Sequence, residues 1–273
     1  MSSFKDKNIL VTGGANGIGR LLGLKSLEQG ARNLVVWDVD EQSMKSLKEE
    51  CNQKGWRCHT YNIDLTDSAA IGKTAAQVKE DVGPIDILFN NAGIVVGKPF
   101  LNQRTDEIQK TIAINVSAVM LTARAFLPEM VAQKSGHIIN ISSASALIGN
   151  PNMSVYAASK WAVTGWSDSL RLEMERSGSN VRVTTVQPSY INTGMFEGVR
   201  APLLTPFLDP EDITDKIIQA VKKNKILLRE PFMVKITPFL KGVLPARIFD
   251  YLAGKLFRVY SSMNRFTGRS TDE

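Results

Sequence analysis

A phenol and an ammonium group lie one helical turn apart in the segment SVYAASKWAVTGW, which starts at residue 154. Tyr156 and Lys160 are four residues apart, so that in a helix they share one face. A tyrosine with its ordinary pKa of about 10 is a poor base at neutral pH. A nearby ammonium favours the phenolate, and we therefore predict that Lys160 lowers the pKa of Tyr156 for proton exchange with a bound hydroxyl. The alternative is a polar pair on a surface helix with no part in chemistry.

Two further polar residues can complete this proton-transfer group. Ser143 follows the strand-like run GHIINI and lies thirteen residues before Tyr156. Ligands of a doubly wound sheet bind beyond the carboxyl ends of its strands, so a serine at this point can hold a substrate oxygen by a hydrogen bond. Asn115 belongs to the long helical segment before that strand, and we expect it to connect Lys160 to solvent through a bridging water.

A glycine-rich segment, TGGANGIG at 12–19, joins the first strand-like run to the first helical one. Gly13, Gly17 and Gly19 stand where the backbone must turn tightly and approach a ligand closely, and the amides of the following helix would face a phosphate. Tight turns of other kinds also use glycines. The position of this turn in the first βα unit of the chain favours a dinucleotide cofactor.

An acidic residue ends the second strand-like run, NLVVWD. Asp38 lies nineteen residues after Gly19, where a carboxylate can accept hydrogen bonds from an adenosine ribose and would repel a 2′-phosphate. Its alternative role is a cap for the helix that begins near Glu41. Because no Arg follows Asp38 to hold a phosphate, the sequence favours NAD over NADP.

Two more strand ends carry residues suited to the adenosine half of such a cofactor. Asp64 follows the third strand-like run and fits a contact with the adenine amino group, although a helix cap ahead of the Asp67 segment explains it nearly as well. The segment Asn90-Asn91-Ala92-Gly93 closes the fourth run. Its small residues and amides can line the ribose site and also join neighbouring strands by hydrogen bonds.

Short β-branched runs alternate with amphipathic segments at regular spacing, which is the βαβ rhythm of a parallel sheet. We predict an α/β fold: a single-domain, Rossmann-type doubly wound sheet of about seven parallel strands with helices on both faces. Residues 1–228 would form the dinucleotide-binding and catalytic domain, and residues 229–273 a basic, apolar C-terminal helical extension packed on it or appended to it. The predicted strands are 8–12, 33–38, 58–64, 85–91, 136–143, 181–188 and 225–229.

In this order and together, the motifs resemble the classical short-chain dehydrogenase/reductase family from residue 7 to about residue 228. The glycine turn and NNAG match the family's motifs, and its Asn-Ser-Tyr-Lys tetrad maps to Asn115, Ser143, Tyr156 and Lys160. The segments WDVDEQ, RAFLPEM, SSASALIG and QPSYINTGMF are similar to the retinol dehydrogenase and 17β-hydroxysteroid dehydrogenase subgroup. The family usually has Pro-Gly after the sixth strand, whereas this chain has Pro188-Ser189, a departure that bears on the path of the loop and the shape of the pocket.

The resemblance implies hydride transfer between an alcohol carbon and a nicotinamide, which in that subgroup usually belongs to NAD. It also implies that Ile191 and Thr193 contact the nicotinamide carboxamide. The residues expected to hold the cofactor are Gly13, Asn16, Gly17, Ile18, Gly19, Asp38, Asp64, Leu65, Asn91, Ala92, Gly93, Tyr156, Lys160, Pro188, Ile191 and Thr193.

The segment 190–208 follows these contacts and is apolar with few charges. We interpret it as a lid over an apolar pocket, and a merely packed loop is the alternative. No Arg or His is placed to bind a carboxylate or phosphate head. We therefore expect a lipophilic alcohol, such as a sterol, retinoid or long-chain alcohol, or the matching carbonyl, in a pocket that includes Ser145, Met153, Met195 and Phe196.

Two other functions fit parts of the pattern. An NADPH-dependent ketone reductase would use the same tetrad, but Asp38 disfavours it. A non-catalytic NAD(H)-sensing or scaffold protein would use the same sheet, but it would have no use for the Tyr-Lys pair.

The excess positive charge of the chain lies near its C-terminus. The formal net charge is +6, and residues 229–269 contain eight Lys/Arg and two acids. No nucleic-acid-binding motif accompanies them, so we expect no nucleic-acid partner. From Pro245 an apolar stripe is predicted at four-residue spacing, with basic residues on the other faces: Leu244, Ile248, Leu252, Leu256 and Tyr260, widened by Phe249 and Val259. Such a helix packs on its own domain or a second subunit, or lies on an anionic membrane; the two readings have even weight.

The N-terminal segment enters a strand within eight residues, and no uncharged apolar run is long enough to span a bilayer. We expect a cytoplasmic protein with a peripheral membrane contact at most. Cys51, Cys58, His59 and His137 lack metal-site spacing, so no metal is expected. The apolar helices near 103–133 and 152–178, together with the family resemblance, indicate a homodimer or homotetramer.

Overall fold

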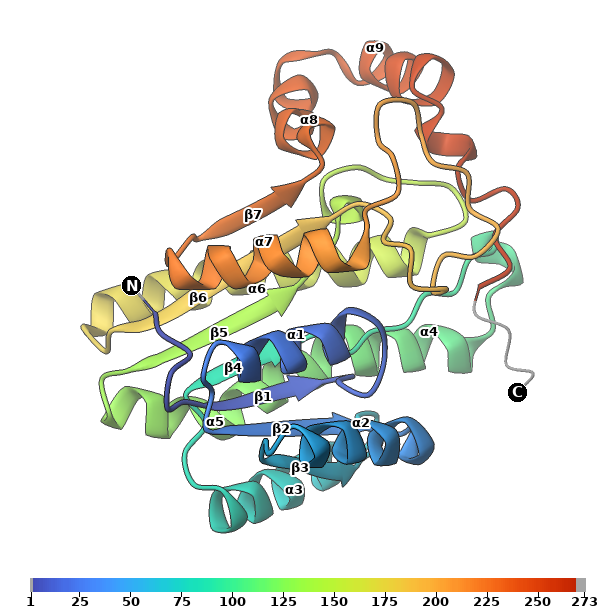
Figure 1. Cartoon of the computed structure of the whole chain (residues 1–273). Helices are drawn as coiled ribbons and strands as arrows, with labels where there is room; N and C mark the ends of the chain where they lie inside the picture. Colours follow the sequence, from blue (N-terminus) through green and yellow to red (C-terminus); the bar gives the residue numbers. More distant parts are fainter. Residues whose placement is uncertain (1, 269–273) are drawn as a thin grey trace.

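A computed structural model describes residues 2–268 of the chain. Its centre is a seven-stranded parallel sheet with the strand order β3-β2-β1-β4-β5-β6-β7 (Figure 1). The predicted doubly wound fold is confirmed. The strands are β1 (Asn8–Thr12), β2 (Asn33–Asp38), β3 (Cys58–Asn62), β4 (Ile87–Asn90), β5 (Gly136–Ile141), β6 (Val181–Pro188) and β7 (Leu227–Glu230).

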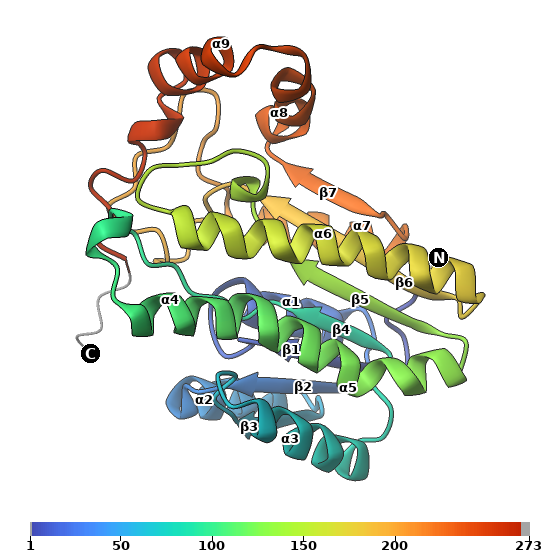
Figure 2. The same ribbon diagram turned by 180° about the vertical axis from the view of Figure 1, so that it is seen from behind.

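The central strands are short apolar runs because helices cover both of their faces. β1 and β4 are buried at every residue, and β5 is buried from its second residue onward. The helices on one face are α1 (Gly17–Glu28), α2 (Glu41–Gln53) and α7 (Pro210–Lys222), and those on the other are α3 (Ser68–Asp81), α4 (Thr105–Ile112), α5 (Ala118–Ala132) and α6 (Ser154–Ser177) (Figures 1 and 2).

The chain reverses its direction of travel across the sheet after β3, since β4 lies on the other side of β1. The loops after β1 and β4 therefore leave the sheet in opposite directions and open a crevice at its carboxyl edge, where ligands of open α/β sheets bind. This crevice brings the glycine turn after β1 next to the NNAG segment after β4. The side chain of Asn91 donates hydrogen bonds to the carbonyls of Thr12 and Gly13, both at 3.0 Å.

The long predicted helix before β5 is interrupted by a π-helical turn, Ala113–Ser117, between α4 and α5. Among the described residues, Thr105–Ala132 is the one helical stretch long and apolar enough to cross a membrane by length and composition. The sequence analysis did not single it out, because charged residues interrupt the run. In the structure α5 packs on β4 and β5, and its own side chains Phe126 and Met130 are buried in the core. This stretch is therefore a core helix of the domain.

The C-terminal extension follows β7 and stands beyond the carboxyl end of that strand (Figure 1). It consists of α8 (Phe232–Val243), α9 (Ala246–Tyr251), a π-helical turn (Leu252–Leu256) and a short 3-10 turn (Val259–Ser261). α8 packs against β7, and the last described residues run back across the 190–208 segment. Arg269 and the rest of the predicted extension lie outside the described residues.

The residues of the apolar stripe predicted from Pro245 onward do not all lie on one face of a helix. Ile248 and Leu256 are exposed, whereas Phe249 and Ala253 are buried. The π-helical turn rotates the residues that follow it, and Arg258, with a φ of 58°, ends the helix before Tyr260. A constant four-residue spacing therefore does not describe one face of this segment.

Candidate active site

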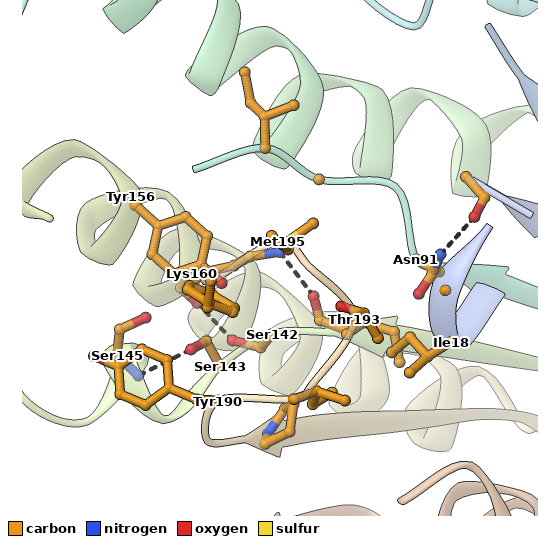
Figure 3. Close-up of a pocket in the computed structure, with 18 of the residues that line it drawn as sticks. Ile18, Asn91, Ser142, Ser143, Ser145, Tyr156, Lys160, Tyr190, Thr193 and Met195 are labelled. Carbon is orange, nitrogen blue, oxygen red and sulfur yellow. Dashed lines mark hydrogen bonds between the residues drawn. The ribbon is translucent and has the colours of Figure 1, made fainter. Parts of the chain in front are cut away.

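A cavity of about 400 Å³ opens at the carboxyl edge of the sheet (Figure 3). Every predicted cofactor and pocket residue lines it, and so do three members of the predicted tetrad. The predicted residues on its wall are Gly13, Asn16, Gly17, Ile18, Gly19, Asp38, Asp64, Leu65, Asn91, Ala92, Gly93, Ser143, Ser145, Met153, Tyr156, Lys160, Pro188, Ile191, Thr193, Met195 and Phe196.

At Gly13 and Gly19 the glycine turn leaves no space for a side chain. A Cβ added at Gly19 would overlap the carbonyl oxygen of Gly13 and approach the side-chain nitrogen of Asn91. Gly13 itself has a φ of +61°, a conformation that disfavours other residues. At the start of α1 the side chain of Asn16 makes no cap hydrogen bond, and the first turn contains no acidic residue. The amides of α1 are therefore available to an anion such as a pyrophosphate.

Two carboxylates lie at the end of β2 on the cavity wall. Asp38 accepts hydrogen bonds from the backbone amides of Ala15 at 2.9 Å and Val39 at 2.8 Å, and it thereby fixes the glycine turn against β2. The cap of α2 is Asp40, not Asp38 as in the alternative considered from the sequence. Asp40 also accepts a hydrogen bond from Asn16 at 2.8 Å. The sequence analysis did not single out Asp40, because its contact with Asn16 depends on how the glycine turn folds over β2.

Asp64 closes the turn after β3 by accepting a hydrogen bond from the backbone of Thr66 at 2.8 Å. This bond holds the pKa of Asp64 below its ordinary value. The cap of α3 is Asp67, which accepts from Ala69 and Ala70. The carboxylate of Asp64 is thus free of the capping role and lines the cavity beside Leu65.

The two serines that follow β5 have different surroundings. Ser142 donates to the backbone carbonyl of Lys160 and pairs with Thr164, both at 2.9 Å, so it fastens α6 to the sheet. Ser143 lines the cavity next to Tyr156, whose pKa its hydroxyl tends to lower. The oxygen of Ser143 also accepts from the amide of Ser145 at 3.1 Å. Ser143 is therefore the one of the pair that can hold a substrate oxygen.

Tyr156 and Lys160 are both buried, and Figure 3 shows them side by side above Ser143. Burial raises the pKa of Tyr156 to about 12, against a smaller opposing effect of the hydrogen bond with Ser143. Burial also lowers the pKa of Lys160 to about 8. In the protein chain by itself, the pKa of Tyr156 is raised, whereas the sequence predicted that it is lowered. The reason is desolvation of the phenol, while the Lys160 ammonium lies 5.7 Å from the ring centre and donates to the Ile141 carbonyl at 3.0 Å.

Asn115 is the one predicted tetrad residue that does not line the cavity. It is fully buried in the π-helical turn, exchanges two hydrogen bonds of 2.9 Å with the backbone of Ile94, and donates to Ser159 at 3.1 Å. Its oxygen and the nitrogen of Lys160 both lie beside Gly93, each 3.3 Å from where a Cβ of that residue would be. Asn115 thus fastens the loop after β4 to α6 next to the ammonium. The water bridge to solvent stays a prediction.

The far half of the cavity is walled by apolar and aromatic side chains. Phe196 stands edge-on to Tyr156 and to Tyr190, with ring centres 6.3 and 5.0 Å apart. Met153 is buried among them. This half carries no charged residue among its described lining: Ala144, Ser145, Leu147, Ile148, Asn150, Met153, Tyr190, Met195, Phe196, Pro202, Thr205, Met233, Val234, Thr237 and Val259.

A polar cluster that the sequence analysis missed holds this half closed. Asn150 donates from its side-chain nitrogen to Tyr190 at 3.1 Å and to Ser262 at 3.0 Å, and the two hydroxyls lie 2.8 Å apart. The hydroxyl of Ser262 donates onward to the carbonyl of Val259 at 2.7 Å. Tyr190 directly follows the unusual Pro188-Ser189, which was the only sequence signal. Its partners are too distant in the chain to be recognised from the sequence.

Fold and cavity together define a dinucleotide-dependent oxidoreductase with a Ser-Tyr-Lys group at the centre of its site. The family model for short chain dehydrogenases matches residues 7–203. Mouse epidermal retinol dehydrogenase 2 is 38% identical over 96% of this chain and 85% of its own length. Human short-chain dehydrogenase/reductase 3 is 36% identical over 97% and 87%, and rat estradiol 17-beta-dehydrogenase 11 is 30% identical over 91% and 83%.

Solved structures agree with this fold. A short-chain dehydrogenase/reductase from Burkholderia phymatum in complex with NAD superposes with a TM-score of 0.81 at 23% identity, covering 89% of this chain and 95% of its own. A short-chain dehydrogenase from Sphingobium yanoikuyae in complex with NADPH has a TM-score of 0.76 at 26% identity, covering 84% and 90%. The chain belongs to the short-chain dehydrogenase family. It is an enzyme that oxidises CH–OH groups, or reduces the matching carbonyls, with a nicotinamide dinucleotide.

Proposed function

We propose that this enzyme uses NAD(H) and acts on a lipophilic primary or secondary alcohol, such as a sterol, retinoid or long-chain alcohol, or on the matching carbonyl. The observation that carries the substrate class is the uncharged wall of the far half of the cavity, which begins at the Ser143 and Tyr156 hydroxyls. An apolar body with one oxygen at its end fits such a wall, whereas a charged head would remain unpaired there. The names of the retinol and estradiol dehydrogenases similar to this chain support the same class.

The preference for NAD rests on Asp38 and Asp40. Both carboxylates line the cavity at the end of β2, where the adenosine ribose of a dinucleotide lies in this fold. A 2′-phosphate would add negative charge beside them. Lys160, in the catalytic half, is the only Lys or Arg among the described residues of the wall. The glycine turn, the uncapped start of α1 and Asn91 would hold the pyrophosphate and the neighbouring ribose.

The nicotinamide, when bound, takes up or supplies the hydride of the alcohol carbon. Ser143 holds the substrate oxygen by a hydrogen bond, and Tyr156 exchanges the proton with that oxygen. With a pKa of about 12, the phenol keeps its proton at neutral pH, which is the form that protonates the oxygen of a carbonyl during reduction. Oxidation requires the phenolate, and the Lys160 ammonium is the positive charge nearest to stabilise it.

A panel of alcohols graded by apolar size, with steroids and retinol included, tests this function by NADH absorbance. We expect turnover to increase with apolar size and Tyr156→Phe to reduce it by about 10²–10⁴-fold. Unchanged turnover by Tyr156→Phe would contradict the proton-transfer role of Tyr156. Titrating NADH and NADPH side by side tests the cofactor preference, and tighter binding of NADPH would reverse it.

A further inference from the structure

The helix α8 is apolar on two opposite faces. Its inner face carries Met233, Val234 and Thr237, which wall the cavity. Its outer face carries Phe232, Phe239 and Val243, at the spacing i, i+7, i+11 of one helical stripe, and their side chains are 67%, 70% and 58% exposed. An apolar face of a helix is normally packed against another part of the protein. Within the described part of the chain, nothing covers this outer face.

Further exposed apolar side chains lie in the elements near α8. Figures 1 and 2 show α8 and α9 together at one end of the molecule, above the loop that follows β6. The amide of Leu203 in this loop donates to the carbonyl of Phe257 at 2.9 Å, so the loop and the extension are joined. We call the following exposed side chains the outer apolar surface: Leu203, Leu204, Phe232, Phe239, Val243, Ile248, Tyr251 and Leu256.

The C-terminal segment that carries most of this surface is basic. Residues 231–268 contain six Lys or Arg and one acid, Asp250, which accepts a hydrogen bond from the hydroxyl of Tyr260 at 2.6 Å. All six basic side chains are exposed: Lys235, Lys241, Arg247, Lys255, Arg258 and Arg265. An excess of one sign repels a second copy of the same surface and attracts an anionic one. Aromatic and aliphatic side chains among Lys and Arg are the composition of segments that lie in a membrane interface.

We propose that the outer apolar surface docks on an anionic lipid bilayer and that the enzyme takes its substrate from the bilayer across α8. This inference rests on the lipophilic substrate proposed above. The cavity wall includes Pro202 and Thr205, which adjoin Leu203 and Leu204 of the outer apolar surface in the sequence. One helix, about 10 Å across, separates the cavity from the outer face. An apolar alcohol therefore passes from lipid to the Tyr156 hydroxyl with little exposure to water.

Binding to vesicles tests the docking surface directly. The full chain is mixed with vesicles of phosphatidylcholine and phosphatidylserine, or of phosphatidylcholine alone, and sedimented at low and high salt. We expect binding to the anionic vesicles at low salt and its loss at high salt, since each Lys or Arg near the surface contributes only while unscreened. Phe232→Ser/Phe239→Ser should weaken this binding at least about tenfold, because two large apolar side chains no longer enter the interface.

The matched control places the same change near the amino ends of β5 and β7, whereas the extension lies beyond the carboxyl end of β7. Val131 and Ile226 are exposed apolar residues at the end of α5 and just before β7, remote from the extension. Val131→Ser/Ile226→Ser should bind vesicles like the unaltered chain. Equal loss of binding in both double variants would overturn the assignment of the surface. The absence of binding to anionic vesicles at low salt would also overturn it. A third contrary outcome is a chain that does not bind vesicles but self-associates, with self-association abolished by Phe232→Ser/Phe239→Ser.

Two substrates separate this inference from the proposed function. Phe232→Ser/Phe239→Ser should oxidise a short, water-soluble alcohol at the rate of the unaltered chain, because neither residue lines the cavity. Its rate on a long-chain alcohol dissolved in anionic vesicles should decrease at least about tenfold. An equal rate for both proteins on the vesicle substrate would overturn delivery from the bilayer and leave the proposed function intact. Vesicle binding without turnover of any alcohol would support the docking surface and overturn the proposed function.

Discussion

The ammonium of Lys160 is fully desolvated, and this has a measurable cost at the residue scale. Its pKa of about 8 in the folded chain lies below the ordinary value of 10.5. Below pH 8 both the folded and the unfolded chains carry the charge, and the folded chain bears a penalty of about 3 kcal/mol. Between about pH 8 and 10.5 only the unfolded chain retains this proton, so the contribution of Lys160 to stability increases with pH in that window.

We therefore expect Lys160→Met to be inactive and yet more stable than the unaltered chain at pH 7. The substitution removes the desolvation penalty of the ammonium but also loses its hydrogen bond to the Ile141 carbonyl. The net gain in the free energy of unfolding is about 2 kcal/mol. Urea denaturation at pH 7 and pH 10 measures it, and the gain should shrink at the higher pH. A less stable variant at pH 7 would contradict the burial penalty.

The raised pKa of Tyr156 makes the two directions of the reaction respond differently to pH. Oxidation needs the phenolate, so its kcat/KM should increase steadily as the pH rises from 7, because the base form becomes more abundant. Reduction needs the protonated phenol and should stay level to about pH 8, where Lys160 begins to lose its proton. Initial rates measured in both directions across this range check the prediction, and an oxidation rate independent of pH would contradict it.

Gly19 is the glycine of the turn after β1 at which a side chain would meet the closest contacts. Gly19→Ala would place a methyl group against the Gly13 carbonyl, so the turn must open and the phosphate site with it. We expect NADH to bind at least about tenfold more weakly, which corresponds to about 1.4 kcal/mol. Gly72→Ala in α3 is the control, since its Cβ would meet no atom within 4 Å. Fluorescence titration with NADH separates the two, and equal affinity would show that the turn absorbs a side chain.

At the scale of elements, the C-terminal segment is tied to the loops that close the cavity. Ser262 accepts hydrogen bonds from Asn150 and Tyr190, two residues on different loops. The amide of Arg200 donates to its carbonyl at 3.0 Å. The 190–208 segment is thus packed and fastened by the extension, which combines the lid expected from the sequence with its alternative, a packed loop.

Ser262→Ala should therefore destabilise more than its position near the chain end suggests. Two buried donors lose their acceptor, at a cost of about 1–3 kcal/mol. We also expect a higher KM for apolar alcohols, because Asn150 and Tyr190 line the cavity. Ser261→Ala is the matched control: its hydroxyl is exposed, and the change should cost less than about 0.5 kcal/mol. Urea denaturation of both variants tests this, and equal stabilities would show that the cluster is not structural.

At the scale of the whole molecule, we expect one face of α6 to contact a second copy of the chain. Trp161, Gly165 and Leu172 lie on one stripe of this helix, at the spacing i, i+4, i+11. The two large side chains are exposed, and a Cβ at Gly165 would meet nothing within 4 Å. Asp168 lies on the same stripe at i+7 and is exposed, so the contact would place its carboxylate beside two apolar side chains.

We expect a homodimer through this stripe and a monomer for Trp161→Glu/Leu172→Glu, because a buried, unpaired carboxylate disfavours association. Analytical ultracentrifugation measures both. Val131→Glu/Ile226→Glu, which alters exposed apolar residues elsewhere, should leave the dimer intact. A monomeric unaltered chain would remove the prediction.

The sequence by itself determined the sheet, the glycine turn and the placing of Ser143, Tyr156 and Lys160. These features depend on local spacing: β-branched runs mark buried strands, and parallel strands bring their carboxyl ends to one edge. Only the tertiary structure decided that burial, more than the neighbouring ammonium, sets the pKa of Tyr156. It also decided that Ser262 closes the cavity and that α8 is open on its outer face. The burial or exposure of a side chain depends on contacts with segments far apart in the chain. A local sequence pattern therefore does not predict it.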